Sequence, residues 1–222
     1  MSGNVGSWTP NGLCRFCLRD DATLTREHVF ARWLVERLRA WRVTYAAHAT
    51  DSTAERARIT ALITNVCGAC NAGWMSGLEV SFRQAVFARS RPERLAEPTR
   101  RTLSRWFAKT AVLVADATGQ ELIPHEHWSD LSHAMPAEIR VGLARIRRPR
   151  QPLDIALEYA TDADHRTAEL ASVAVQVGEL VGVVTRRSSL TVRATTLWPL
   201  RSHVLRWTTL PVVNRLSDLT GG

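Results

Sequence analysis

The sequence of 222 residues lacks the features that mark membrane, secreted and disordered proteins. No apolar run reaches the roughly 18 residues of a membrane span, so we expect neither an integral membrane protein nor a membrane partner. The first residues contain no basic cluster followed by an apolar stretch, and we therefore expect no secretion signal and a cytoplasmic location. Hydrophobic residues make up 45% of the chain, which argues against intrinsic disorder and favours a globular protein.

Lysine is almost absent: Lys109 is the only one, so 28 of the 29 basic residues are arginines. Arginine binds phosphate groups through planar, two-point contacts. The formal net charge of +8 comes from the first half, since residues 1–110 carry 17 basic and 9 acidic side chains and residues 111–222 carry 12 of each. This distribution favours an anionic partner, nucleic acid first, whereas a solvated basic face is the simpler alternative.

Cysteine is also scarce, and its four copies form two C-x-x-C pairs, Cys14 with Cys17 and Cys67 with Cys70. In a cytosolic protein two such pairs predict a tetrahedral zinc site with four thiolate ligands. A thioredoxin-like redox motif needs only one pair, in a βαβ context that the sequence lacks. Structural disulfides are disfavoured in the cytoplasm. We therefore expect a structural Zn²⁺ that joins distant parts of the chain.

The hydrophobic pattern predicts an α+β protein in three parts. The first, residues 1–90, has a strand near 25–29, a helix over 30–41, a β-prone segment at 59–66 and a helix that begins at Asn71. A helical middle part over residues 91–135 contains a long helix at 97–115. The third part, residues 136–222, has short β-prone segments that predict an antiparallel sheet, at 139–146, 153–159, 171–186 and 189–198.

A carboxylate lies next to an imidazole in the segment Leu24-Thr-Arg-Glu-His-Val-Phe, between the two cysteine pairs. Glu27 offers oxygen ligands to a hard metal ion, and His28 can accept a proton near neutral pH. On a regular strand the two would point to opposite faces, and His28 could simply hydrogen-bond Glu27. Asn71 follows the second cysteine pair, where it could bind a metal or cap the following helix. This combination suits metal-assisted phosphodiester hydrolysis.

The order C-x-x-C, Thr-Arg-Glu-His-Val and C-x-x-C-Asn within residues 14–80 resembles the HNH endonucleases, which have the ββα-metal fold. The stretch over residues 67–79 resembles a bacterial subgroup of uncharacterised HNH-like proteins. The resemblance implies a zinc-containing, HNH-like ββα-metal module in residues 1–90. It also implies metal-dependent hydrolysis of phosphodiester bonds, with DNA as the substrate.

Carried over by position, the resemblance gives three residues catalytic roles. It implies that Glu27 and Asn71 bind a catalytic divalent cation and that His28 is the general base that activates water. Oxygen ligands suit Mg²⁺ or Mn²⁺ better than Zn²⁺. The four cysteines keep the structural Zn²⁺.

Several positions depart from the family's pattern, among them Ala31, where a proline is common. Ala61-Leu62 stand where an asparagine is usual, with Asn65 as the nearest substitute, and Met75 stands where some members have a further histidine. These departures keep open a non-catalytic zinc-binding module that binds nucleic acid or a protein partner. A redox-responsive protein that uses its C-x-x-C pairs is a third reading.

Overall fold

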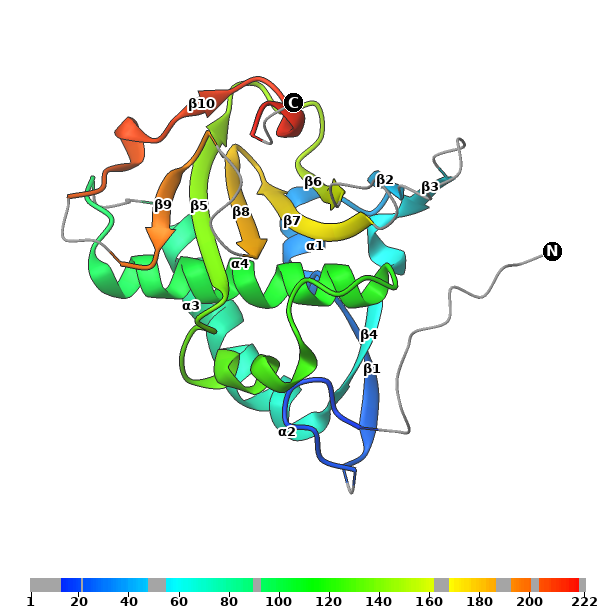
Figure 1. Cartoon of the computed structure of the whole chain (residues 1–222). Helices are drawn as coiled ribbons and strands as arrows, with labels where there is room; N and C mark the ends of the chain where they lie inside the picture. Colours follow the sequence, from blue (N-terminus) through cyan, green and yellow to red (C-terminus); the bar gives the residue numbers. More distant parts are fainter. Residues whose placement is uncertain are drawn as a thin grey trace.

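The computed structural model describes residues 13–20, 22–47, 55–89, 93–161, 168–186, 193–200 and 204–219. The fold is α+β, as the hydrophobic pattern predicts: a long helix lies between a curled β-sheet and a layer of smaller elements (Figure 1). Among the described helices, none is long and apolar enough to cross a membrane.

The central helix α4 (Glu97–Ala117) is covered on every side over much of its length. All side chains of residues 106–116 are buried, the polar ones included. A helix that has no face exposed to solvent must be packed between two layers, and α4 lies between the sheet and the layer of smaller elements. On the side away from the sheet, Trp106 stacks on Phe82 of helix α3 (Ser76–Phe87), with ring centroids 3.6 Å apart.

The sheet is the predicted antiparallel one, with one parallel pair that the pattern did not indicate. Its strands are β5 (Ile139–Ile146), β6 (Leu153–Thr161), β7 (Ala168–Val177), β8 (Leu180–Arg186), β9 (Thr195–Trp198) and β10 (Val212–Val213). They follow the order β10-β5-β8-β7-β6, and β9 also pairs with β5. One edge of β5 therefore pairs with β8, while its other edge is shared by antiparallel β9 and parallel β10.

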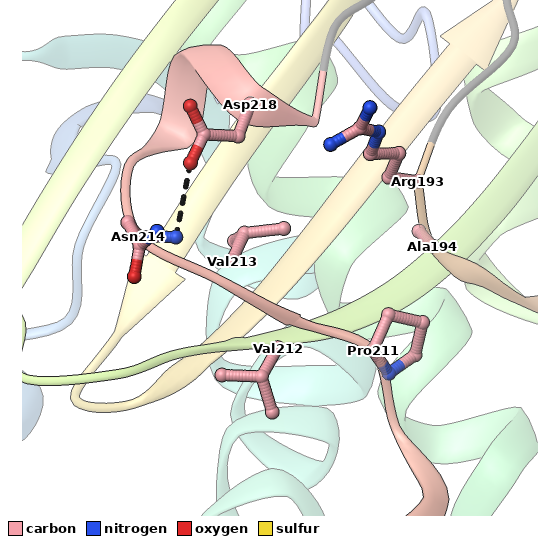
Figure 2. Close-up of a pocket in the computed structure, with 7 residues that line it drawn as sticks. All are labelled: Arg193, Ala194, Pro211, Val212, Val213, Asn214 and Asp218. Atoms are coloured by element: carbon pink, nitrogen blue, oxygen red, sulfur yellow. Dashed lines mark hydrogen bonds between the residues drawn. The ribbon is translucent and has the colours of Figure 1, made fainter.

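A surface pocket of about 430 Å³ lies along the β9–β10 edge (Figure 2). Arg193 and Asp218 bring opposite charges to it. The Asp218 carboxylate already accepts the backbone N–H groups of Asn214 and Arg215, at 3.0 Å each. None of the four cysteines lines this pocket.

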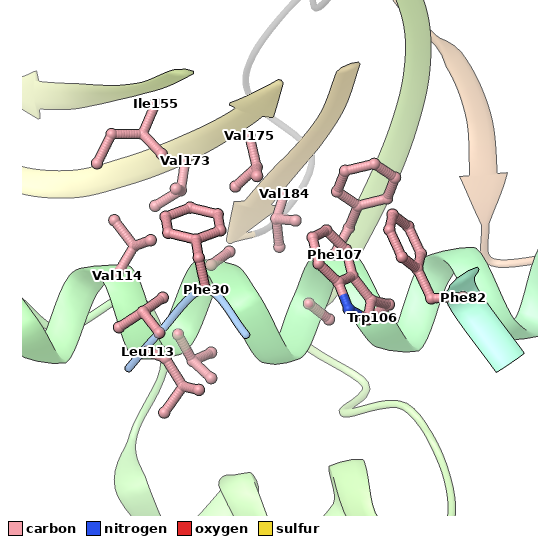
Figure 3. Close-up of a cluster of buried hydrophobic side chains, with 14 of the residues drawn as sticks. Phe30, Phe82, Trp106, Phe107, Leu113, Val114, Ile155, Val173, Val175 and Val184 are labelled. Carbon is pink, nitrogen blue, oxygen red and sulfur yellow. The ribbon is translucent and has the colours of Figure 1, made fainter. Parts of the chain in front are cut away.

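The main hydrophobic core joins segments from both halves of the chain. Phe30, Val114 of α4 and Val173 of β7 belong to one buried cluster (Figure 3). A smaller cluster on the opposite face of the sheet includes Val181 and Val183 of β8 and is covered by the C-terminal segment. The division of the chain into three parts stays a prediction.

The N-terminal layer contains the strand near 25–29 and the β-prone segment at 59–66 that the sequence indicates, and these two pair with each other. Strand β1 (Leu24–His28) pairs antiparallel with β4 (Ile63–Cys67). Between them the chain forms helix α1 (Arg32–Leu38), the antiparallel pair β2 (Thr44–Ala47) and β3 (Glu55–Arg58), and a 3₁₀ turn, η1 (Ile59–Ala61). After β4 come the single turn α2 (Gly68–Cys70), the kinked turn η2 (Asn71–Met75) and α3.

One close contact between α4 and the sheet depends on a glycine. A Cβ atom at Gly182 of β8 would lie 2.2 Å from two ring atoms of Phe107. We therefore expect Gly182→Ala to lower the free energy of unfolding by about 1–3 kcal/mol, because extra volume in a filled core forces its neighbours to shift. Urea denaturation should show this as a lower midpoint with an unchanged slope.

Gly77→Ala in α3 is the matched control, since no atom lies within 4 Å of a Cβ added there. This change should stabilise the protein by about 0.5–1 kcal/mol, because alanine is the better helix former. Adding Phe107→Leu to Gly182→Ala should relieve part of the strain. An equal stability of the Gly182→Ala and Gly77→Ala variants would contradict the prediction.

Candidate metal centre

The four cysteines form one cluster, here called the four-cysteine site. Their sulfur atoms all lie within 4.8 Å of one another, and only Cys17 is partly exposed. The Sγ atoms of Cys17 and Cys67 are 3.7 Å apart, too far for a disulfide bond of about 2.05 Å. A tetrahedral ion with zinc–sulfur bonds of about 2.3 Å separates its ligands by about 3.8 Å. The thiols are therefore close enough to bind a metal such as zinc, as their spacing predicts.

Local backbone structure presents these sulfur atoms to one another. Cys14 and Cys17 lie in a tight turn, closed by the Leu18 N–H that donates to the Cys14 carbonyl at 3.0 Å. Cys67 ends β4 and Cys70 ends α2. The Cys67 N–H donates to the Cys14 sulfur at 3.3 Å, which joins the two pairs directly.

The pKa values of Cys14 and Cys70 shift in opposite directions, because hydrogen bonds favour ionisation of Cys14 and burial opposes ionisation of Cys70. Burial opposes ionisation of Cys14, but N–H groups of Cys17, Cys67 and Phe16 outweigh it and lower its pKa to about 7. Burial and the neighbouring thiol of Cys67 raise the pKa of Cys70. Four thiolates at this distance repel one another, so a bound dication is what allows all of them to ionise.

Arg15, inside the first C-x-x-C pair, ties the site to the central helix. Its Nη2 lies 2.9 Å from the Asp116 carboxylate near the end of α4, and the two side chains are only 2% and 8% exposed. Thr64 of β4 donates its hydroxyl to the same carboxylate at 2.8 Å. The next residue, Phe16, packs edge-on against Trp74, with ring centroids 4.9 Å apart. The turn that carries Cys14 and Cys17 is therefore joined to α4 by a buried ion pair, which Thr64 of β4 also contacts.

The predicted catalytic pair of β1 is separated by strand geometry. Glu27 is paired with Thr64 and His28 with Ile63, in a strand whose five residues are all in register. Because neighbouring residues of a strand point to opposite faces, Glu27 shares a face with buried Thr64. His28 is exposed on the other face, which it shares with Asn65.

The register also separates His28 from the cysteines along the strand pair. Cys67 is opposite Leu24, four residues from His28. At about 3.4 Å per residue this is about 14 Å. Among the described residues, the four cysteines are the only group of three or more His, Cys, Asp or Glu side chains that could hold a metal ion.

Asn71 lies directly behind Cys70 and is the C-cap of the single turn α2, but it is not the N-cap of a helix. The helical run begins three residues earlier than the pattern predicts, at Gly68, and its N-cap is Cys67, whose sulfur accepts the Cys70 N–H at 3.4 Å. Asn71 instead opens η2, the turn in which Gly73 takes non-helical dihedral angles (φ −85°, ψ −113°) and kinks the chain between α2 and α3. Met75, at the end of η2, is buried in the core.

A second buried polar cluster, which sequence reasoning missed, lies between α1, α3 and α4. The Glu79 carboxylate of α3 accepts from Lys109 Nζ at 2.6 Å and from the Trp106 and Trp33 indoles at 2.8 and 3.1 Å. Lys109 is 2% exposed and Glu79 13%. A signal was present: the only lysine of the chain lies within an apolar stretch.

No family model, curated protein or solved structure matches the chain in sequence or fold comparisons. Any function assigned to this chain therefore rests on its own residues and contacts and on the resemblance of its motifs.

Proposed function

We propose that this protein is a metal-dependent endonuclease of the HNH type that hydrolyses phosphodiester bonds in DNA. One observation carries the proposal: the four-cysteine site lies at one end of the β1–β4 pair, and β1 contains the Glu-His pair of the motif. A strand pair, a metal-binding turn and a following helix are the parts of a zinc-containing ββα-metal module. The basic first half of the chain supports DNA as the substrate.

In this proposal the chain's residues divide into a structural and a catalytic group. The four thiolates would hold Zn²⁺, and a set of four cysteine ligands is typical of a structural site. Glu27 and Asn71 would hold Mg²⁺ or Mn²⁺, and so few protein ligands are usual for Mg²⁺, which keeps waters and binds substrate phosphate. When bound, such a cation stabilises negative charge on the phosphate. His28, exposed at the end of β1, would accept a proton from the attacking water.

A non-catalytic zinc module that binds nucleic acid is the second candidate. The observation that favours it is the separation of Glu27 and His28 onto opposite faces of β1. In this alternative Glu27, which is paired with Thr64, has only a structural role, and His28 is an ordinary surface residue.

Removing His28, the proposed general base, distinguishes the nuclease from the non-catalytic zinc module. His28→Ala should reduce cleavage of supercoiled plasmid by about 10²–10⁴-fold, the usual contribution of a positioned base. The assay measures nicked and linear DNA after incubation with Mg²⁺, Mn²⁺ or EDTA. Because His28 is exposed and holds no zinc in this proposal, the zinc content and unfolding temperature should not change.

His133→Ala is the matched control, since His133 is exposed and lies outside the motif. It should cleave at the wild-type rate. If neither wild-type protein nor control cleaves with any metal, while both bind DNA, the zinc-module candidate replaces the nuclease. If His28→Ala loses zinc or folds poorly, its assignment as the base is wrong.

A further inference from the structure

An aromatic pair joins helices α1 and α3 at the surface. Trp33 of α1 and Phe87 of α3 meet edge-to-face, with ring centroids 5.9 Å apart. Both rings are partly exposed. The indole N–H of Trp33 donates to Glu79, so the buried cluster around Lys109 holds this ring in place from the protein interior. The pair is therefore a rigid feature of the surface.

Each ring carries an arginine from the other helix. The guanidinium carbon of Arg83 lies 5.6 Å from the centroid of Trp33, and that of Arg37 lies 5.7 Å from the centroid of Phe87. Both arginine side chains are exposed. A guanidinium group held over a ring keeps its outward N–H groups available for an anion, and less side-chain entropy is lost on binding. Arg37 and Arg83 are called the α1–α3 arginine pair below.

The charge of this surface is not cancelled by neighbouring carboxylates. Within the described part of the chain, no carboxylate lies within 4.0 Å of Arg37 or Arg83. The nearby Glu36 is bound by Arg32 at 2.8 Å, and Glu79 by Lys109 at 2.6 Å. The α1–α3 arginine pair therefore leaves two fixed positive charges facing solvent.

We propose that the α1–α3 arginine pair binds the phosphate backbone of nucleic acid. The aromatic pair holds the two planar guanidinium groups apart. Two separate groups of this kind suit a chain of discrete phosphates better than a diffuse negative surface. The inference deepens the proposed function and rests on it only in taking nucleic acid as the partner. It adds a contact surface outside the cysteine and Glu-His motifs.

The test measures binding of a short fluorescent DNA duplex by anisotropy at several salt concentrations. The Arg37→Gln/Arg83→Gln variant should bind at least about 10-fold more weakly at low salt, and the slope of log affinity against log salt should fall by about 2, since each phosphate contact contributes about 0.9. The control is Arg101→Gln/Arg145→Gln, which removes the same charge from two exposed arginines already paired with Glu97 and Glu179. It should keep both the affinity and the slope.

Each outcome points to a different conclusion. If wild-type protein binds DNA and the Arg37→Gln/Arg83→Gln variant binds equally well with the same slope, the α1–α3 arginine pair does not contact DNA. The proposed function then stands. If wild-type protein binds no DNA at low salt, both fail. Binding to phosphatidylserine vesicles in place of DNA would assign the arginine pair to a membrane surface and overturn the inference. Circular dichroism must show that both variants are folded.

Discussion

Removal of the metal should unfold the N-terminal layer and loosen α4 with it. Structural zinc contributes about 10–16 kcal/mol in small zinc domains, which is as large as the whole stability of a typical domain. Here the ligand turn also holds Arg15, whose buried carboxylate partner belongs to α4. We therefore expect this layer to be unfolded at ordinary temperature in the Cys14→Ser and Cys70→Ser variants and after treatment with a strong chelator. Such protein should show no cooperative unfolding transition on heating. Circular dichroism and thermal melts measure this loss.

Metal analysis provides the controls for that result. Wild-type protein should contain one Zn²⁺ per chain, and adding Zn²⁺ back after chelation should restore the melt. Conservative replacement of an exposed hydroxyl, Ser81→Ala on α3, should leave metal content and melting unchanged. A Cys70→Ser variant with wild-type stability would show that the four-cysteine site has no structural role. Zinc that resists mild oxidation would also argue against a redox-responsive protein.

Lys109→Met should lower the free energy of unfolding by about 3–5 kcal/mol. Breaking a buried ion pair costs this much because it leaves the other charge without compensation, here the Glu79 carboxylate. The Trp33 and Trp106 indoles remain as its donors, but neither carries a charge. Urea denaturation measures the change, and the native far-ultraviolet spectrum confirms that the variant folds.

Two further variants show whether the loss of stability comes from the unpaired charge of Glu79. Lys109→Met/Glu79→Gln should recover much of the loss, since the pair is then replaced by neutral groups of similar volume. Arg32→Gln removes the cation of an exposed pair, 81% and 49% accessible, and should cost at most about 1 kcal/mol. If Lys109→Met cost no more than Arg32→Gln, the buried pair would not be a stabilising feature.

The four-cysteine site could be predicted from the sequence because its chemistry is local. Each C-x-x-C pair fixes two sulfur atoms within one turn, and the need for four ligands brings the pairs together. The residue pattern also indicated the strand near 25–29 and the β-prone segment at 59–66, but their pairing as β1 and β4 is a finding of the structure. For the cysteines, ligand type and spacing were sufficient.

Helix ends were predicted less well, because apolar periodicity does not report backbone dihedral angles. The pattern extends the first helix to Trp41, but α1 ends at Leu38, where Arg39 takes a left-handed conformation with φ 54°. Trp41 is consequently 49% exposed instead of facing the core. The start at Gly68 was missed for a related reason: a cysteine sulfur served as the cap, a role usually taken by oxygen.

Buried charge pairs could not be matched to partners from the sequence. Arg15 and Asp116 meet only through the tertiary fold, as do Glu79 and Lys109. What the sequence does indicate is that Lys109 and Asp116 interrupt an apolar helix, and a buried charge needs a partner. For Glu27 and His28, strand alternation was the informative rule, and their shared catalytic role stays a prediction.

The position of α4 between two layers has a consequence for protein synthesis. The helix is made before every strand of the sheet that covers it, and β5, the first of those strands, pairs on both edges with strands made later. While it is still attached to the ribosome, the growing chain therefore lacks the sheet that covers Phe107 and its apolar neighbours on one side of α4. Such surfaces attract chaperones and favour aggregation when synthesis stalls. Yield should thus depend on how quickly the last strands are completed.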